Sequence, residues 1–102
     1  MNRKDTVYQS AVDSEVETLK KSNFTELMEL PFGTKYDFKF QTKDYNGQLC
    51  HLLPDTTSPF HSIVLLTERK MFLVYRKYLA GFSFNDNFEI FKIEDEILYS
   101  FD

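Results

Sequence analysis

The chain has 102 residues, a formal net charge of −4 and one cysteine. Chains of this length usually fold as one domain, so we expect a single core over residues 1–102. The acidic balance argues against nucleic acid as a partner, because phosphate backbones are bound mainly through lysine and arginine. A lone cysteine forms no intramolecular disulfide, which favours a cytoplasmic location. No apolar run is long enough for a membrane-spanning helix, and we expect no membrane partner.

The first part of the chain is predicted to be helical. Four apolar residues recur at helical spacing: Tyr8, Val12, Val16 and Leu19. This spacing predicts an amphipathic helix over residues 5–21. Asn23 followed three residues later by Glu26 is typical of a helix start, so we expect a second, short helix that ends before Pro31.

Residues 35–43 alternate between aromatic or threonine side chains and charged or polar ones, the pattern of a half-buried antiparallel strand. An asparagine-glycine pair follows at residues 46–47, and this pair tolerates the positive φ angles of a two-residue hairpin turn. A turn there pairs Thr42 with His51. It places His51 on the inner face of the sheet and Cys50 on the outer face.

Residues 60–79 are the densest apolar stretch and allow two interpretations. A helix could begin just before this stretch and end at Gly81. However, the apolar blocks at residues 63–66 and 71–75 are separated by the polar residues 67–70, and a helix would lose its apolar stripe over that turn. We therefore predict a hairpin with a solvent-exposed basic turn at residues 67–70.

The last quarter of the chain predicts one more strand pair. Gly81 interrupts the preceding strand, and residues 82–85 pair with residues 88–93 across an Asn-Asp-Asn turn. Beyond them, Asp95 is a good helix N-cap, which favours a short C-terminal helix, although the alternation of apolar residues over 97–101 also suits a strand.

These elements define an α+β fold. One or two N-terminal helices pack on a curved antiparallel sheet of about five or six strands, and a short C-terminal helix or strand closes the domain.

The sequence contains no catalytic signature. Cys50 and His51 are neighbours on a strand and project to opposite faces, so they form no thiol–base pair. The spacing of His51, His61 and Asp55 matches no compact metal-ligand motif, and His61 is expected near solvent. We therefore predict a non-enzymatic protein that needs no cofactor and no metal.

Acidic residues dominate the chain after Gly81, where Lys92 is the single basic residue. Aromatic side chains lie among these acids, and such a surface suits a basic partner protein, because charge steers the encounter and aromatics anchor the complex. The candidate partner-binding residues are Asp86, Glu89, Phe91, Glu94, Asp95, Glu96 and Tyr99. The combination predicts a small inhibitor of the immunity or antitoxin type that masks a basic partner.

Two alternatives belong to other classes. A curved sheet could bind a small ligand, or host a small enzyme, in an aromatic pocket formed by Tyr36, Phe38, Phe40, His51 and Tyr75. Surplus aromatic residues could instead form the interface of a structural subunit or a homodimer.

Overall fold

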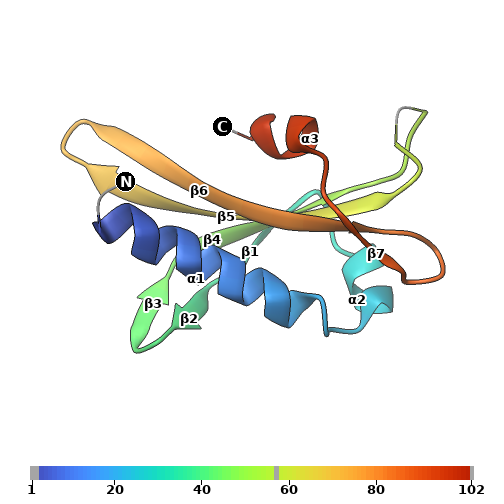
Figure 1. Cartoon of the computed structure of the whole chain (residues 1–102), viewed down its shortest axis with the longest axis horizontal. Helices are drawn as coiled ribbons and strands as arrows, with labels where there is room; N and C mark the ends of the chain where they lie inside the picture. The colour runs from blue at the N-terminus through green and yellow to red at the C-terminus, as the bar shows by residue number, and fades with distance from the viewer. Residues whose placement is uncertain (1–2, 57, 102) are drawn as a thin grey trace.

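The computed structural model describes residues 3–56 and 58–101 and confirms the α+β class (Figure 1). Its elements are α1 (Arg3–Leu19), α2 (Phe24–Met28), β1 (Gly33–Lys35), β2 (Phe38–Phe40), β3 (Lys43–Tyr45), β4 (Gly47–Leu52), β5 (His61–Met71), β6 (Val74–Phe84), β7 (Ile90–Lys92) and α3 (Asp95–Tyr99).

Five antiparallel strands form the main sheet in the order β1-β4-β5-β6-β7. Figure 1 shows α1 and α3 on opposite sides of this sheet, with the two-stranded sheet β2-β3 beside α1. The larger core lies on the α1 side, and a smaller cluster around Cys50 and Val64 lies under α3.

Helix α1 packs through the stripe that its sequence predicts. Val12, Val16 and Leu19 are buried against the sheet, and Tyr8 is partly buried. The predicted second helix is present as α2, and Asn23 is its N-cap, because the side-chain oxygen of Asn23 accepts a hydrogen bond from the backbone N–H of Thr25 at 3.0 Å.

A buried carboxylate joins α1 to the β5-β6 hairpin. Asp5 in the first turn of α1 accepts hydrogen bonds from Arg69 at 3.1 Å and from the hydroxyl of Tyr78, and it forms an ion pair with Arg76 at 3.0 Å. Arg69 and Arg76 lie directly opposite each other on β5 and β6. The hydrogen bond from Tyr78 and the two guanidinium charges hold the pKa of Asp5 below its ordinary value, so this carboxylate stays charged between the two arginines.

The hairpin predicted for residues 60–79 is confirmed, but its predicted turn is wrong. Strands β5 and β6 pair without interruption from His61 opposite Phe84 to Met71 opposite Val74, so the turn is Phe72-Leu73 and not residues 67–70. Phe72 has a positive φ of 47° at this turn. Gly81 does not interrupt β6. The polar residues 67–70 fit within β5 because Asp5 neutralises the arginine among them.

The predicted register of the first hairpin is also wrong. Its turn is Gln41-Thr42, where Gln41 has a φ of 57°, and Phe38 lies opposite Tyr45. The predicted partnership of Thr42 with His51 does not form, although His51 does lie on the α1 side of the sheet. Asn46 instead separates β3 from β4, and Gly47 is the first residue of β4. A Cβ at Gly47 would lie 2.4 Å from the carbonyl oxygen of Tyr36, so this glycine permits close approach of two backbones.

The C-terminal pairing is confirmed in part. Residues 82–84 pair with β7, which is Ile90–Lys92, but Phe88 lies outside the strand with a φ of 63°. The C-terminal segment forms the helix α3, whose N-cap is Glu94 and not Asp95. Within the described residues, no helix is long and apolar enough to cross a membrane.

Replacing Gly81 with alanine is expected to destabilise the fold by about 1–3 kcal/mol. An added Cβ would lie 2.4 Å from the carbonyl oxygen of Ile63, and the backbone of this central strand pair has no room to move. Urea unfolding measures the change. Gly33→Ala is the matched control on the edge strand β1, because its Cβ meets only the flexible end of Gln48. Equal stabilities of the two variants would contradict this explanation.

Candidate functional site

A cleft of about 360 Å³ lies between α3 and the loop that joins β4 to β5. Apolar side chains, carboxylates and serines line it: Leu52, Leu53, Phe60, Ile97, Asp55, Glu94, Glu96, Ser58, Ser62 and Ser100. Among the described residues, every charged side chain that lines this cleft is a carboxylate. We call this feature the acidic cleft.

Local hydrogen bonds shape the loop side of the acidic cleft. The backbone N–H of Asp55 donates to the carbonyl of Ser58 at 2.8 Å, and the N–H of Ser58 donates back to the Asp55 carboxylate at 2.9 Å. These bonds close a tight turn that places Asp55 at the cleft. Phe60 follows the turn, and its ring contacts Phe91 of β7 with centroids 4.7 Å apart.

Helix α3 forms the other side of the acidic cleft. Ile97 and Leu98 pack on the small core cluster around Cys50 and Val64, which fixes the helix on the sheet. Glu94 and Glu96 lie at the start of this helix, where carboxylates are favoured by the orientation of the peptide dipoles. The underside of α3 is therefore apolar, and its first turn carries negative charge.

The predicted partner-binding residues are all exposed, but they do not form one cluster. Asp86 and Glu89 lie in the turn between β6 and β7, and Phe91 lies on β7. The remaining four belong to α3 or its N-cap, and of the seven only Glu94 and Glu96 line the acidic cleft.

Sequence reasoning missed the contribution of the β4-β5 loop to this cleft. Leu53, which is 68% exposed, Asp55 and Phe60 all come from that segment. The sequence does place Asp55 between the apolar residues Leu53 and Phe60 in a turn-rich loop. The proximity of that loop to α3, however, depends on tertiary structure.

The five residues predicted for an aromatic pocket do not converge. The rings of Tyr36 and Phe38 are adjacent, at 6.4 Å, but Phe38 is buried against Tyr45 in the core. Phe40 ends β2, and His51 contacts His61. Tyr75 is 62% exposed on β6, opposite Lys70 and close to the end of the hairpin.

The structure also pairs two buried histidines. His51 Nδ1 lies 3.0 Å from the carbonyl oxygen of Leu30, and His51 Nε2 lies 3.0 Å from His61 Nδ1. A carbonyl can only accept, so Nδ1 of His51 donates, and in the neutral pair Nε2 accepts from His61. Nε2 of His61 then faces Asp86 at 3.8 Å. His61 is 7% exposed, which corrects its predicted position near solvent.

Burial lowers the pKa of His61, and the neighbouring His51 lowers it further, while Asp86 opposes the shift. His61 therefore favours the neutral state, in which the two rings complete a chain of hydrogen bonds from the carbonyl of Leu30, just after α2, to His61 at the start of β5. In the part of the chain that is described, no group of three or more His, Cys, Asp or Glu side chains is arranged to hold a metal ion.

No protein-family model, curated protein or solved structure matches this chain. Its function is therefore inferred from its own geometry.

Stability is expected to fall as the pH drops below about 6.5, the ordinary pKa of histidine. The pKa of His61 is lower in the folded state, so the unfolded chain binds a proton that the folded chain resists, and this stabilisation is complete only above that pH. Urea unfolding at about pH 7.5 and about pH 5.5 measures the loss. His61→Gln should show a smaller loss over this interval, and an identical loss in both proteins would exclude His61 as its source.

Proposed function

We propose that this chain is a non-catalytic, cytosolic protein-binding module that receives a basic side chain of a partner protein in the acidic cleft, in the manner of an immunity or antitoxin protein. The observation that carries this proposal is the meeting of an apolar floor and three carboxylates in one concavity. The single cysteine, Cys50, is buried and unpaired, which agrees with a reducing compartment.

The lining of the acidic cleft matches the two parts of a long basic side chain. The aliphatic stem of arginine or lysine packs on apolar surface, while its charged head seeks carboxylates. Leu52, Phe60 and Ile97 offer the apolar contact, and Glu94 and Glu96 offer the charge. Arginine is the better fit of the two, because its planar guanidinium bonds carboxylates in a bidentate manner.

The surface around the acidic cleft suits the same partner. Phe91 is 38% exposed and Tyr99 is 64% exposed, so both can contribute aromatic contact area at the rim of an interface. The exposed Asp86, Glu89 and Asp95 extend the negative charge on either side, and they would raise the association rate with a basic protein.

The double variant Glu94→Lys/Glu96→Lys tests the proposal. Tagged wild-type protein captures a partner from an extract of its own host, and titration calorimetry then measures the affinity of the purified pair. We expect the double variant to bind at least about tenfold more weakly, because the two cleft carboxylates that attract the basic side chain are replaced by positive charges that repel it. The weakening should be smaller in high salt, which screens exposed charges.

Asp37→Lys/Asp44→Lys is the matched control, because it makes the same change of charge near β2 and β3, away from the acidic cleft. It should keep most of the wild-type affinity. Unchanged binding by Glu94→Lys/Glu96→Lys, or equal weakening by both double variants, would rule out the acidic cleft as the binding site.

A further inference from the structure

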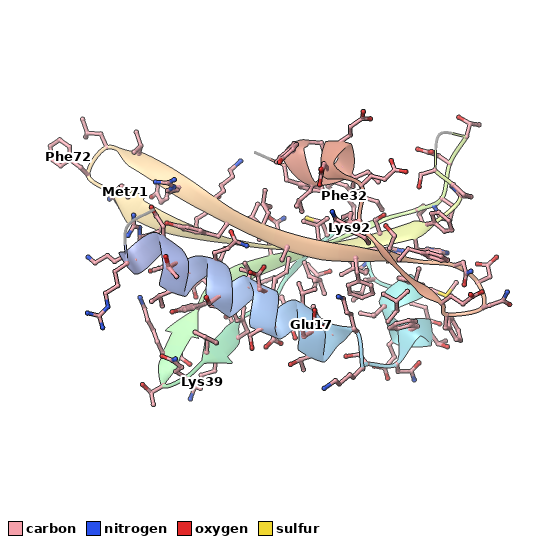
Figure 2. The ribbon with its side chains drawn as sticks, viewed as in Figure 1. Glu17, Phe32, Lys39, Met71, Phe72 and Lys92 are labelled. Carbon is pink, nitrogen blue, oxygen red and sulfur yellow. The ribbon has the colours of Figure 1, made fainter. Side chains whose placement is uncertain are left out.

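The β5-β6 hairpin ends in an exposed apolar tip. Phe72, Leu73, Val74 and Tyr75 are 90%, 84%, 61% and 62% exposed. Soluble proteins rarely leave contiguous apolar residues in water unless these residues contact something else. We call these four residues the apolar tip, and Figure 2 shows the ring of Phe72 pointing away from the body of the molecule.

The apolar tip projects because the hairpin is longer than its neighbours. Strand β4 pairs with β5 only as far as Thr67, and β7 pairs with residues 82–84 of β6. Beyond Thr67, β5 and β6 continue as a two-stranded ribbon, which extends about 15 Å at the rise of a β-strand. Figure 1 shows this ribbon reaching past the start of α1.

A basic hollow of about 560 Å³ lies at the base of this ribbon. Five cationic residues line it together with Val7 and Tyr8: Arg3, Lys4, Lys43, Arg69 and Lys70. Arg69 is bound to Asp5, and Lys43 Nζ donates to the hydroxyl of Tyr8 at 3.1 Å. Arg3, Lys4 and Lys70 are exposed. The hollow therefore suits a phosphate group.

We propose that the apolar tip and the basic hollow together dock this protein on an anionic lipid bilayer. The apolar tip enters the boundary between headgroups and acyl chains, and the basic hollow receives a lipid phosphate. Lys70 lies two residues behind Phe72, which corresponds to about 7 Å along a strand. This spacing matches the depth of roughly 5–10 Å to which amphipathic surfaces insert, so the cations reach the headgroups when the tip is buried.

Other occupants fit these observations less well. A second copy that met tip to tip would bring two basic hollows close together, and like charges would repel. The rings of Phe72 and Tyr75 could stack on nucleic-acid bases, but the exposed aliphatic side chains of Leu73 and Val74 between them gain nothing from a base, whereas all four side chains gain from entering a bilayer. A bilayer instead accepts a convex tip without a preformed groove. The expectation of no membrane partner rests on the absence of an apolar run long enough to span a bilayer, whereas docking through a hairpin tip requires no spanning helix.

Docking through the apolar tip leaves the proposed protein-binding site accessible. Figure 1 shows the β4-β5 loop, which borders the acidic cleft, at the opposite end of the molecule from the tip. The acidic end would face away from an anionic surface. The two proposals therefore rest on different residues and fail independently.

Vesicle co-sedimentation tests the docking proposal. The full chain is mixed with vesicles of phosphatidylcholine alone, or with vesicles that contain roughly a third phosphatidylserine. We expect wild-type protein to sediment with the anionic vesicles only. Phe72→Ser/Leu73→Ser should lower the partition coefficient at least about tenfold, because two large apolar side chains no longer enter the bilayer. Lys4→Glu/Lys70→Glu should lower it by a similar factor in low salt.

Each double variant has a matched control elsewhere on the surface. Phe32→Ser/Tyr99→Ser removes two apolar residues that are 62% and 64% exposed, and Lys35→Glu/Lys39→Glu reverses two exposed lysines. Both controls should bind vesicles like the wild type, and circular dichroism checks that every variant is folded. Glu94→Lys/Glu96→Lys should still bind anionic vesicles, which separates this result from the protein-binding proposal.

Three results would overturn the docking proposal. The first is no sedimentation of the wild type with anionic vesicles, and the second is equal binding by Phe72→Ser/Leu73→Ser and its control. The third is that Phe72→Ser/Leu73→Ser leaves vesicle binding unchanged and alters only self-association or the binding of a DNA oligonucleotide, both measured by analytical ultracentrifugation. That result would assign the apolar tip to a second copy or to nucleic acid.

Discussion

The continuous pairing of β5 with β6 is the constraint on which the other elements depend. It offers one edge to β4 and the other to β7, one face to α1 and the other face to α3. Ile63, Leu65 and Phe82 are almost fully buried at its centre. Because this hairpin is longer than the strands beside it, one of its ends is available as a projecting ribbon, while the other holds His61 against His51.

Charge is distributed along the molecule in a way that follows from the same hairpin. At the ribbon end, two arginines stand opposite each other, an arrangement that is unfavourable without a counter-ion. The Asp5 carboxylate supplies that counter-ion from the first turn of α1, so helix and ribbon hold each other in place. Basic residues gather at this end, and carboxylates gather around α3 and the β4-β5 loop. The two proposed surfaces would therefore attract partners of opposite charge.

The sequence predicts the helices and the central hairpin of this fold well, and it predicts the first hairpin and the turn positions poorly. Periodicity reveals α1, α2, the central hairpin and α3, because burial of one face is a local property of each segment. The predicted turn positions are wrong where tertiary contacts override local preference. Gly47 of the asparagine-glycine pair is needed for the close approach of two backbones, and the chain turns at Gln41 instead. The acidic cleft is predicted only through Glu94 and Glu96. Asp55 lies beside Glu94 and Glu96 only in the folded chain, and the spacing of these residues along the sequence does not reveal this proximity.

The single cysteine gives this molecule an internal chemical reporter. Cys50 lies beneath α3 in the cluster that also contains Ile97 and Leu98, and burial raises the pKa of its thiol. A thiol in that position reacts only when the short helix above it lifts from the sheet, because reaction requires both access and ionisation. The rate of labelling by a thiol reagent therefore measures the opening of the helix that borders the acidic cleft, and a partner bound in that cleft would slow it.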